Sequence, residues 1–275
     1  MASDRNATDP PASSEPRLGP FGITALASDS TWPYVLPMGV YLVLSSFEPS
    51  APTPGLPQEP NSLGLTYSDY PLVYSVKLAI VAVVLWLCSA AWRQWPLRVS
   101  PLAVGVGAVG VVAWIACCKL NLEGQLTSAL GPDHWAMGVL GLLGLGMERP
   151  AFNPFDQLGG TPLFQNSFLV VRFIGLALLV PVFEELLLRG WLVRNIVSPN
   201  FWRVEFGRVT TQAAIIATAF PMLYHPEKLA SLVWFTLVTW LMVRTKNYWD
   251  CVAAHAVTNL LLGLYVVNTG SWELW

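Results

Sequence analysis

Long apolar segments are the feature that most limits how this chain can fold. Judged by windows of about 20 residues, the length that crosses a bilayer, they lie at about 32–47, 71–92, 101–118, 167–194, 209–225, 228–243 and 249–267. The chain is 54% hydrophobic and 12% charged, whereas an average soluble domain has about 25% charged residues. The sequence therefore predicts an all-α, polytopic transmembrane helix bundle of about seven spans, with six or eight as the alternatives.

The segments around these spans predict one membrane domain behind a polar tail. Residues 1–30 lack the basic start and apolar core of a signal peptide, so we expect a disordered polar N-terminal tail. Residues 31–275 then form a single transmembrane domain. Between the third and fourth spans, residues 138–146 (GVLGLLGLG) are too few to cross a bilayer and predict an interfacial or re-entrant helix, with an eighth span as the alternative.

The loops differ in charge, and this difference predicts the orientation of the chain. The linker at 48–70 holds acidic residues but no Lys or Arg, whereas Arg93 and Arg98 follow the second span. Further loops carry Arg194, Arg203, Arg208, Arg244 and Lys246. Because loops rich in Lys and Arg stay in the cytoplasm, we expect a cytoplasmic N-terminus and a C-terminus outside.

Two classes of site are disfavoured by composition. A net charge of −2 without a basic stripe gives no electrostatic footprint for nucleic acid. The cysteines lie within or beside apolar segments without the spacing of metal ligands, so we expect buried, free thiols. They are Cys88, Cys117, Cys118 and Cys251.

Three ionisable residues, Glu184, Glu185 and Arg189, stand inside the apolar stretch 168–197. Each such side chain at the bilayer centre costs about 2.5–3.5 kcal/mol on insertion scales, so the group needs partners or a chemical task. Glu185 and Arg189 are four residues apart and can neutralise each other on one helix face. Glu184 points about 100° away from Glu185, toward a cavity where it could act as a general base. The alternative is a structural ion network, or an interfacial cluster in which arginine snorkels.

Two of the three histidines fall in later apolar segments. His225 ends one segment, and His255 stands four residues before Asn259 in the last, so this pair shares a helix face. A carboxamide can donate to an oxyanion, and an imidazole can orient water. The alternative is that each of these polar side chains only links helices by hydrogen bonds. His134, in the long connection, is expected at the surface.

The ordered set of motifs resembles the CAAX-processing and bacteriocin-processing (CPBP) intramembrane glutamic proteases. Glu184, Glu185 and Arg189 match the first motif, Glu-Glu-x-x-x-Arg, while His255 and Asn259 match the third, His-x-x-x-Asn/Asp. The resemblance covers about residues 165–267, which we take as the protease-like core. It implies an intramembrane endopeptidase that acts on a peptide segment of another membrane-associated protein.

The second motif of that family is Phe-x-x-x-His, and here the chain departs from it. His225 is present, but Pro221 stands where phenylalanine is expected, and Phe220 is one residue too early. Because proline tends to kink a helix, this departure affects the expected backbone around His225 more than the expected role of its side chain. Residues 244–275 resemble the bacterial branch associated with exosortase protein-sorting systems, which implies a bacterial inner membrane and possible partnership with a sorting system.

The resemblance also implies a role for each residue. Glu184 would activate a water molecule, His255 and Asn259 would stabilise the oxyanion, and His225 would bind or orient the water. Glu185 and Arg189 would hold the geometry. No cofactor is expected from this mechanism.

Two other functions remain open on the sequence alone. The first is a zinc hydrolase in which Glu184, His225 and His255 are the ligands and a fourth position is open, although the chain lacks a His-Glu-x-x-His helix. The second is a membrane scaffold or immunity-type protein without proteolytic activity, partnering a sorting system.

In the predicted orientation, His225 lies at a different depth in the bilayer from Glu184 and His255. Counting from the cytoplasmic loops puts Glu184 and His255 in the inner half of the bilayer, and His225 about 10 Å or more farther out. Either the stretch 203–208 enters the membrane before the helix begins, or Pro221 bends the end of the helix back.

Overall fold

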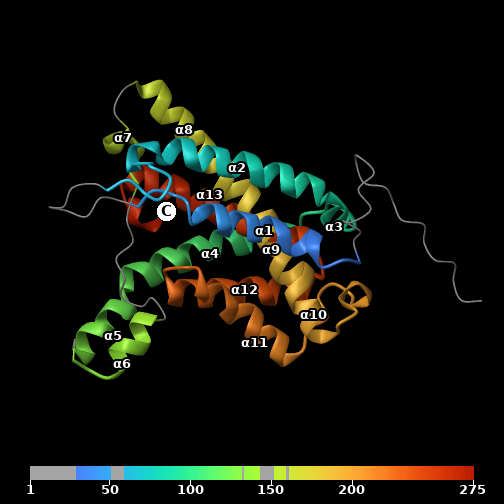
Figure 1. Ribbon diagram of the computed structural model, residues 1–275. Helices are drawn as coiled ribbons and strands as arrows, with labels where there is room; N and C mark the ends of the chain where they lie inside the picture. Colours follow the sequence, from blue (N-terminus) through green and yellow to red (C-terminus); the bar gives the residue numbers. More distant parts are fainter. Residues whose placement is uncertain (1–28, 51–58, 132, 143–151, 159–160) are drawn as a thin grey trace, which may run out of the picture.

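The computed structural model describes residues 29–50, 59–131, 133–142, 152–158 and 161–275, and within these ranges it contains helices and loops but no strand. The α-helices are α1 Trp32–Ser45, α2 Tyr70–Leu87, α3 Ser89–Arg93, α4 Pro101–Leu120, α5 Leu122–Leu130, α6 Ala136–Leu142, α7 Pro154–Gln157, α8 Pro162–Ile174, α9 Val180–Glu185, α10 Val193–Val197, α11 Thr211–Ala219, α12 Lys228–Thr245 and α13 Tyr248–Thr269 (Figure 1). Short 3-10 turns cover Tyr67–Asp69, Phe201–Arg203, Phe220–Leu223 and Trp272–Leu274, and π-helical turns cover Gly175–Leu179 and Leu186–Leu192.

The predicted all-α bundle is confirmed, and a helix occurs at each predicted span. Among the described residues, 4 helical segments are long and apolar enough to cross a membrane: Tyr67–Leu87, Pro101–Leu130, Pro162–Val197 and Tyr248–Thr269. Trp32–Ser45 and Thr211–Leu223 are shorter apolar helices. α12 has 18 residues and lies between α11 and α13 in sequence. Of the expected tail, residues 1–28 lie outside the described part of the chain, as do 143–146 of the short apolar segment, whose first part is in α6.

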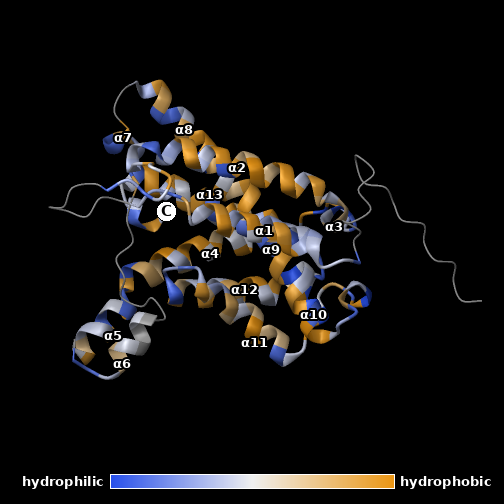
Figure 2. Ribbon diagram, in the orientation of Figure 1, coloured by the Kyte–Doolittle hydropathy of each residue, from blue (hydrophilic) through white to orange (hydrophobic). Residues whose placement is uncertain are grey.

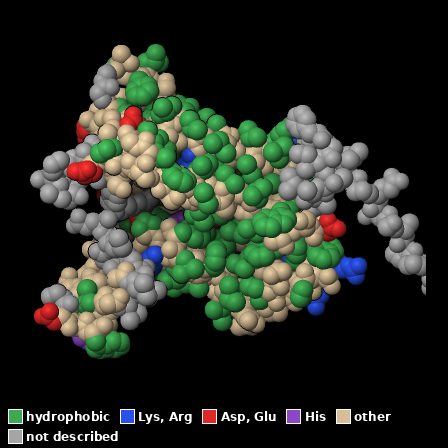
Figure 3. Space-filling view, viewed as in Figure 1, with side chains coloured by type: hydrophobic (Ala, Val, Ile, Leu, Met, Phe, Trp, Pro, Cys, Tyr) green, Lys and Arg blue, Asp and Glu red, His purple; other side chains and the backbone are tan. Residues whose placement is uncertain are grey.

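Apolar side chains cover much of the face shown in Figure 3, across the middle of the bundle, and most of the charged side chains on this face lie toward its two ends. The helices of the bundle are largely hydrophobic in Figure 2. On α2, for example, Leu72, Val76 and Val83 are 66%, 49% and 56% exposed. Exposed apolar area of this extent marks a surface that meets lipid. The chain is an integral membrane protein.

α4 and α13 cross closely in the middle of the bundle because α4 has glycines there. A Cβ atom at Gly107 would lie 2.6 Å from the Ala254 carbonyl oxygen. One at Gly110 would overlap the Trp234 ring of α12. The Thr258 hydroxyl donates to the Gly107 carbonyl oxygen at 2.9 Å. Small residues of this kind let membrane helices approach each other, and here they fix the helix that carries His255.

The segment Pro162–Val197 is one long helix with two irregular stretches. π-helical turns at Gly175–Leu179 and Leu186–Leu192 stand before and after α9, whose last residues are Glu184 and Glu185. Pro181 in the first turn of α9 has no N–H to donate. π-helical turns of this kind are frequent at functional sites, and these two set the direction in which the glutamates point.

Candidate functional site

Glu185 forms a buried ion pair with Arg189, as their spacing predicts. Arg189 Nη1 lies 3.2 Å from Glu185 Oε1 and 3.1 Å from Oε2, and both side chains are fully buried. Nη2 of the arginine donates to the Phe235 carbonyl oxygen at 3.2 Å and to Thr239 Oγ1 at 3.4 Å. The pair therefore ties α9 to α12, and its charges are held in one geometry.

Glu184 faces the other way and meets polar side chains from two later segments. Its Oε1 accepts a hydrogen bond from the Tyr224 hydroxyl at 2.5 Å and lies 3.3 Å from His225 Nε2. Its Oε2 lies 3.7 Å from His255 Nε2. Glu184 is 1% exposed, and within the described residues no Lys or Arg forms an ion pair with it. This carboxylate therefore keeps one oxygen that no short hydrogen bond occupies.

His255 bridges the two glutamates. Its Nδ1 lies 3.0 Å from Glu185 Oε1, so this nitrogen carries a hydrogen and donates to the carboxylate. Its Nε2 is then the ring atom that faces Glu184.

Asn259 is held by the irregular part of the long helix. Its Nδ2 donates to the Leu176 carbonyl oxygen at 2.7 Å, within the π-helical turn Gly175–Leu179. This bond assigns the amide orientation, because only the nitrogen can donate to a carbonyl. The second N–H of the same amide remains for a ligand. Asn259 lines the cavity that contains Glu184.

The backbone changes from an α-helix to a 3-10 turn around Pro221, shortly before His225. α11 ends at Ala219, and the chain continues as a 3-10 turn over Phe220–Leu223 with Pro221 inside it. The His225 N–H donates to the Pro221 carbonyl oxygen at 3.0 Å, which closes the turn. After this turn, the His225 imidazole lies beside Glu184, with Nε2 3.3 Å from Oε1.

One cavity of about 380 Å³ joins the predicted site residues. Glu184, His225, His255 and Asn259 all line it. Glu185 and Arg189 lie behind this wall, so the six predicted residues form one connected group with two layers. His134 is in the connection before α6 and belongs to neither layer.

Two further residues of the cavity were missed by the sequence analysis. Tyr224 donates to Glu184, and its only signal in the sequence is its place next to His225. Trp114 is 7% exposed, its ring lies edge-on to that of His225 at 5.8 Å, and its indole N–H has no partner among the described residues. Trp114 comes from α4, an apolar span, so no polar neighbour in the sequence indicated that it belongs to the site.

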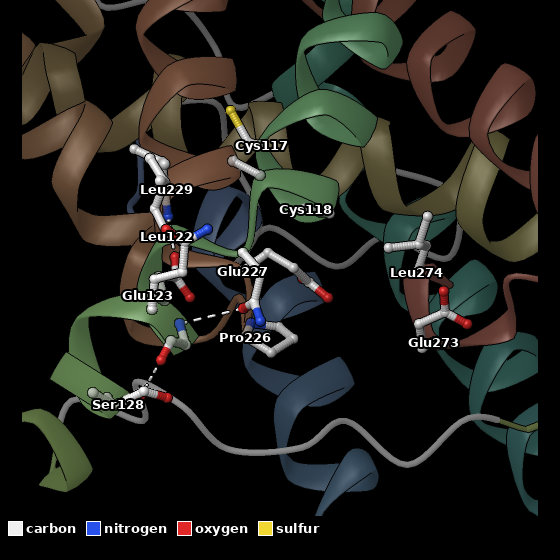
Figure 4. A pocket seen from close by; sticks show the side chains of 15 residues that line it. Cys117, Cys118, Leu122, Glu123, Ser128, Pro226, Glu227, Leu229, Glu273 and Leu274 are labelled. Atoms are coloured by element: carbon white, nitrogen blue, oxygen red, sulfur yellow. Dashed lines mark hydrogen bonds between the residues drawn. The ribbon is translucent and has the colours of Figure 1, made fainter. Parts of the chain in front are cut away.

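A second cavity, of about 730 Å³, adjoins the first and shares Pro226, Glu227 and Leu274 with it. In Figure 4 the carboxylates of Glu123, Glu227 and Glu273 surround this space. The thiols that were expected to be buried divide into two pairs. Cys88 and Cys251 are buried, whereas the other two are half-buried at this second cavity.

Metal ligation depends on how donor side chains converge. Within the described residues, no group of three or more His, Cys, Asp or Glu side chains is spaced to hold a metal ion. The zinc alternative based on Glu184, His225 and His255 stays a prediction, and chelation is its direct test.

Comparison with known proteins finds a family similarity over the part of the chain that contains this site. Residues 166–261 match the family described as Type II CAAX prenyl endopeptidase Rce1-like. This range contains all six predicted site residues and both π-helical turns. Neither the curated proteins nor the solved structures give a match. Through residues 166–261, the chain is therefore similar to a family of CAAX prenyl endopeptidases.

Proposed function

We propose that this protein is an intramembrane endopeptidase in which Glu184 activates water for attack on a peptide bond. The observation that carries the proposal is the surroundings of Glu184. It is a buried carboxylate that pairs with no Lys or Arg of the described residues, at a cavity wall with His225 and His255 on its two oxygens. A structural ion network explains Glu185 and Arg189. It does not explain a second carboxylate that is left for the cavity.

The first step is attack of water on the substrate carbonyl. Glu184 Oε2 takes a proton as the water oxygen bonds to the carbonyl carbon, and the carbonyl π electrons move to its oxygen. The resulting oxyanion accepts hydrogen bonds from the free N–H of Asn259 and from His255 Nε2–H. Donors that are fixed in a water-poor site stabilise such an intermediate without having to reorganise.

The second step is collapse of the intermediate. The electrons return to the carbonyl, the carbon–nitrogen bond breaks, and protonated Glu184 gives its proton to the leaving nitrogen. His225 and Tyr224 hold Glu184 Oε1, so that the other oxygen faces the reacting atoms. Glu185, held by Arg189, keeps His255 in the orientation that directs Nε2 toward the oxyanion.

The setting of this reaction follows from the bundle and from the sequence. The substrate is a segment of another membrane-associated protein, and no cofactor takes part. We place the protein in a bacterial inner membrane, with the N-terminus in the cytoplasm and the C-terminus outside because of the basic loops. A protein-sorting system is the proposed source of the substrate.

The test is cleavage of a panel of membrane-associated peptides by the purified protein in lipid vesicles. Glu184→Gln should lower the rate about 10²- to 10⁴-fold, the usual contribution of a general base. Glu273→Gln, at the second cavity, is the matched control and should leave the rate nearly unchanged. A strong zinc chelator should have no effect.

Each alternative has its own outcome in this test. Cleavage that the chelator abolishes and added zinc restores would establish the zinc hydrolase. Full activity of folded Glu184→Gln would overturn the role of the glutamate. Absence of cleavage over the whole panel would favour the scaffold function.

A further inference from the structure

Trp114 is a residue of the cavity wall whose indole N–H is not used by the folded chain. The side chain is 7% exposed, and Nε1 has no hydrogen-bond partner among the described residues. Other tryptophans do use this group: Trp92 donates to the Leu85 carbonyl oxygen at 3.2 Å, and Trp249 to that of Trp95 at 3.1 Å. Because a buried donor without an acceptor is destabilising, the N–H of Trp114 calls for a ligand.

The position of this indole is fixed by the face of α4 that packs on α12 and α13. Trp114 stands about one helical turn after Gly110, where the lack of a side chain leaves room for the Trp234 ring. About two turns before Trp114, Gly107 lies against the Ala254 carbonyl. The indole is itself part of the main apolar core. Close helix packing therefore holds the ring in place before any ligand enters the cavity.

The indole lies one side chain away from the proposed general base. Its ring centre is 5.8 Å from that of His225, and the two rings are 75° apart. His225 Nε2 in turn lies 3.3 Å from Glu184 Oε1. All three residues line the same cavity. An acceptor that enters this cavity close to the reacting atoms can therefore meet the unused N–H.

The chemistry of the indole indicates which kind of acceptor fits. An indole N–H is a single, uncharged donor and cannot accept a hydrogen bond, so its ligand must supply an acceptor atom. The Glu184 carboxylate lines the same cavity and disfavours an anion beside it, because like charges repel. A neutral carbonyl oxygen therefore fits this position better than a carboxylate does.

A peptide substrate brings such carbonyl oxygens with it. In a helix, each carbonyl oxygen accepts from the N–H four residues later. When a segment is extended so that one of its peptide bonds reaches Glu184, the neighbouring carbonyls lose these partners, and the hydrocarbon core of a membrane supplies no water to replace them. A donor that is already fixed in the cavity wall offsets this loss.

We propose that the Trp114 N–H binds a main-chain carbonyl oxygen of the peptide substrate, beside the bond that is cut. This inference rests on the proposed function, because it assigns a substrate contact in the same cavity. Since one imidazole separates the indole from Glu184, the carbonyl belongs to a residue within about two positions of the cut, at about 3.3–3.6 Å per extended residue. Trp114 is thereby a substrate-binding residue outside the matched range 166–261.

Variants at position 114 remove the N–H and change the ring as little as possible. Trp114→Phe keeps one aromatic ring, and benzothienylalanine at this position keeps both fused rings with sulfur in place of the N–H. Trp92→Phe is the control, because the N–H that it removes is used in the folded chain. In lipid vesicles, kcat/KM should fall about 5- to 150-fold in both position-114 variants, since a buried carbonyl is left unpaired, and should stay nearly unchanged in Trp92→Phe.

Thermal unfolding in the same detergent separates substrate binding from folding. Trp92→Phe loses a hydrogen bond of the folded chain and should have a lower Tm. The benzothienylalanine variant loses none and should keep the native Tm. A lower Tm in that variant would overturn the proposal, because it would mean that the folded chain itself uses the N–H of Trp114.

Changes in the substrate identify the acceptor. In a series of peptides, each amide near the cut bond, but not that bond itself, is replaced in turn by an ester, whose carbonyl oxygen is a weaker acceptor. At one position the ester should lower kcat/KM for the native protein and have little effect in Trp114→Phe, because the two changes remove the same contact. At the other positions the two losses should multiply. Mass spectrometry of the products verifies that the same bond is cut.

The outcomes distinguish this inference from the proposed function. Native kcat/KM in both position-114 variants, or losses that multiply at every ester position, would overturn the contact and leave the protease intact. If no peptide is cleaved, the Kd values of the same peptides for the protein in vesicles decide. An ester effect on Kd that disappears in Trp114→Phe supports the contact, and an effect that persists there, or absent binding, overturns it.

Discussion

Tyr224 donates its hydroxyl hydrogen to Glu184 Oε1 at 2.5 Å, across forty residues of sequence. The bond joins the turn before α12 to the end of α9, and it fills one lone pair of the oxygen that also meets His225. In the proposed mechanism, the tyrosine thereby leaves Oε2 of Glu184 as the oxygen that meets water.

Replacing this tyrosine by phenylalanine should slow cleavage and leave the fold intact. Tyr224→Phe removes one hydrogen bond to a charged group, worth about 1.5–3 kcal/mol, so kcat/KM should fall about 10- to 100-fold. Steady-state cleavage in vesicles measures it. Tyr265→Phe, on α13 outside the cavity lining, is the control. Unchanged kcat/KM in Tyr224→Phe would show that the contact has no role in turnover.

The Glu185–Arg189 pair should matter first for stability. Glu185→Gln or Arg189→Gln leaves a buried charge alone and should cost about 3–5 kcal/mol. The double variant should cost less than the sum of the two, because it removes both charges. Unfolding of each protein in the same detergent, followed by circular dichroism, gives the comparison. Additive losses would mean that the two side chains act independently.

Asn259 should be required for turnover beyond its structural hydrogen bond. Asn259→Leu removes an oxyanion donor and should lower kcat about 10²- to 10³-fold. Asn268→Leu is the matched control, because Asn268 also donates from its amide to a main-chain carbonyl, that of Leu264, at 2.6 Å, but on an exposed part of α13. Similar small losses in both variants would assign Asn259 a packing role alone.

The glycines of α4 should be needed to seat His255. Gly107→Val puts side-chain atoms against the Ala254 carbonyl and Val257, and overpacking of this kind costs about 1–3 kcal/mol or more. Gly105→Val, where no atom lies within 4 Å of the new Cβ, tests the effect of valine itself on the same helix. We expect a lower Tm and less cleavage for Gly107→Val only. Equal Tm values would refute the close contact between α4 and α13.

Much of the fold was predictable because each long span is apolar enough to be recognised locally. The ion pair between Glu185 and Arg189 was predictable for the same reason, since helical periodicity places residues four apart on one face. The contacts of Glu184 with His225 and His255 depend on three separate segments. The sequence motifs suggested their convergence, but the distances came from the structure.

Other parts of the site depend on irregular backbone, which periodicity does not describe. The π-helical turn Gly175–Leu179 supplies the carbonyl that holds Asn259, and nothing in its apolar sequence marks it as wider than an α-helix. The 3-10 turn at Pro221 was predictable as a bend, but its direction was not. Tyr224 and Trp114 were missed because an aromatic residue in an apolar segment normally indicates packing.

The contact between Glu185 and His255 spans 70 residues of sequence, and this separation has a consequence for biosynthesis. At about 5–20 residues per second, a ribosome needs roughly 4–14 s to add the residues between them. During that time the glutamates are already made, while the imidazole and the carboxamide of the last helix are not. In the proposed mechanism, the catalytic set of the growing chain is therefore incomplete until its final helix joins the bundle.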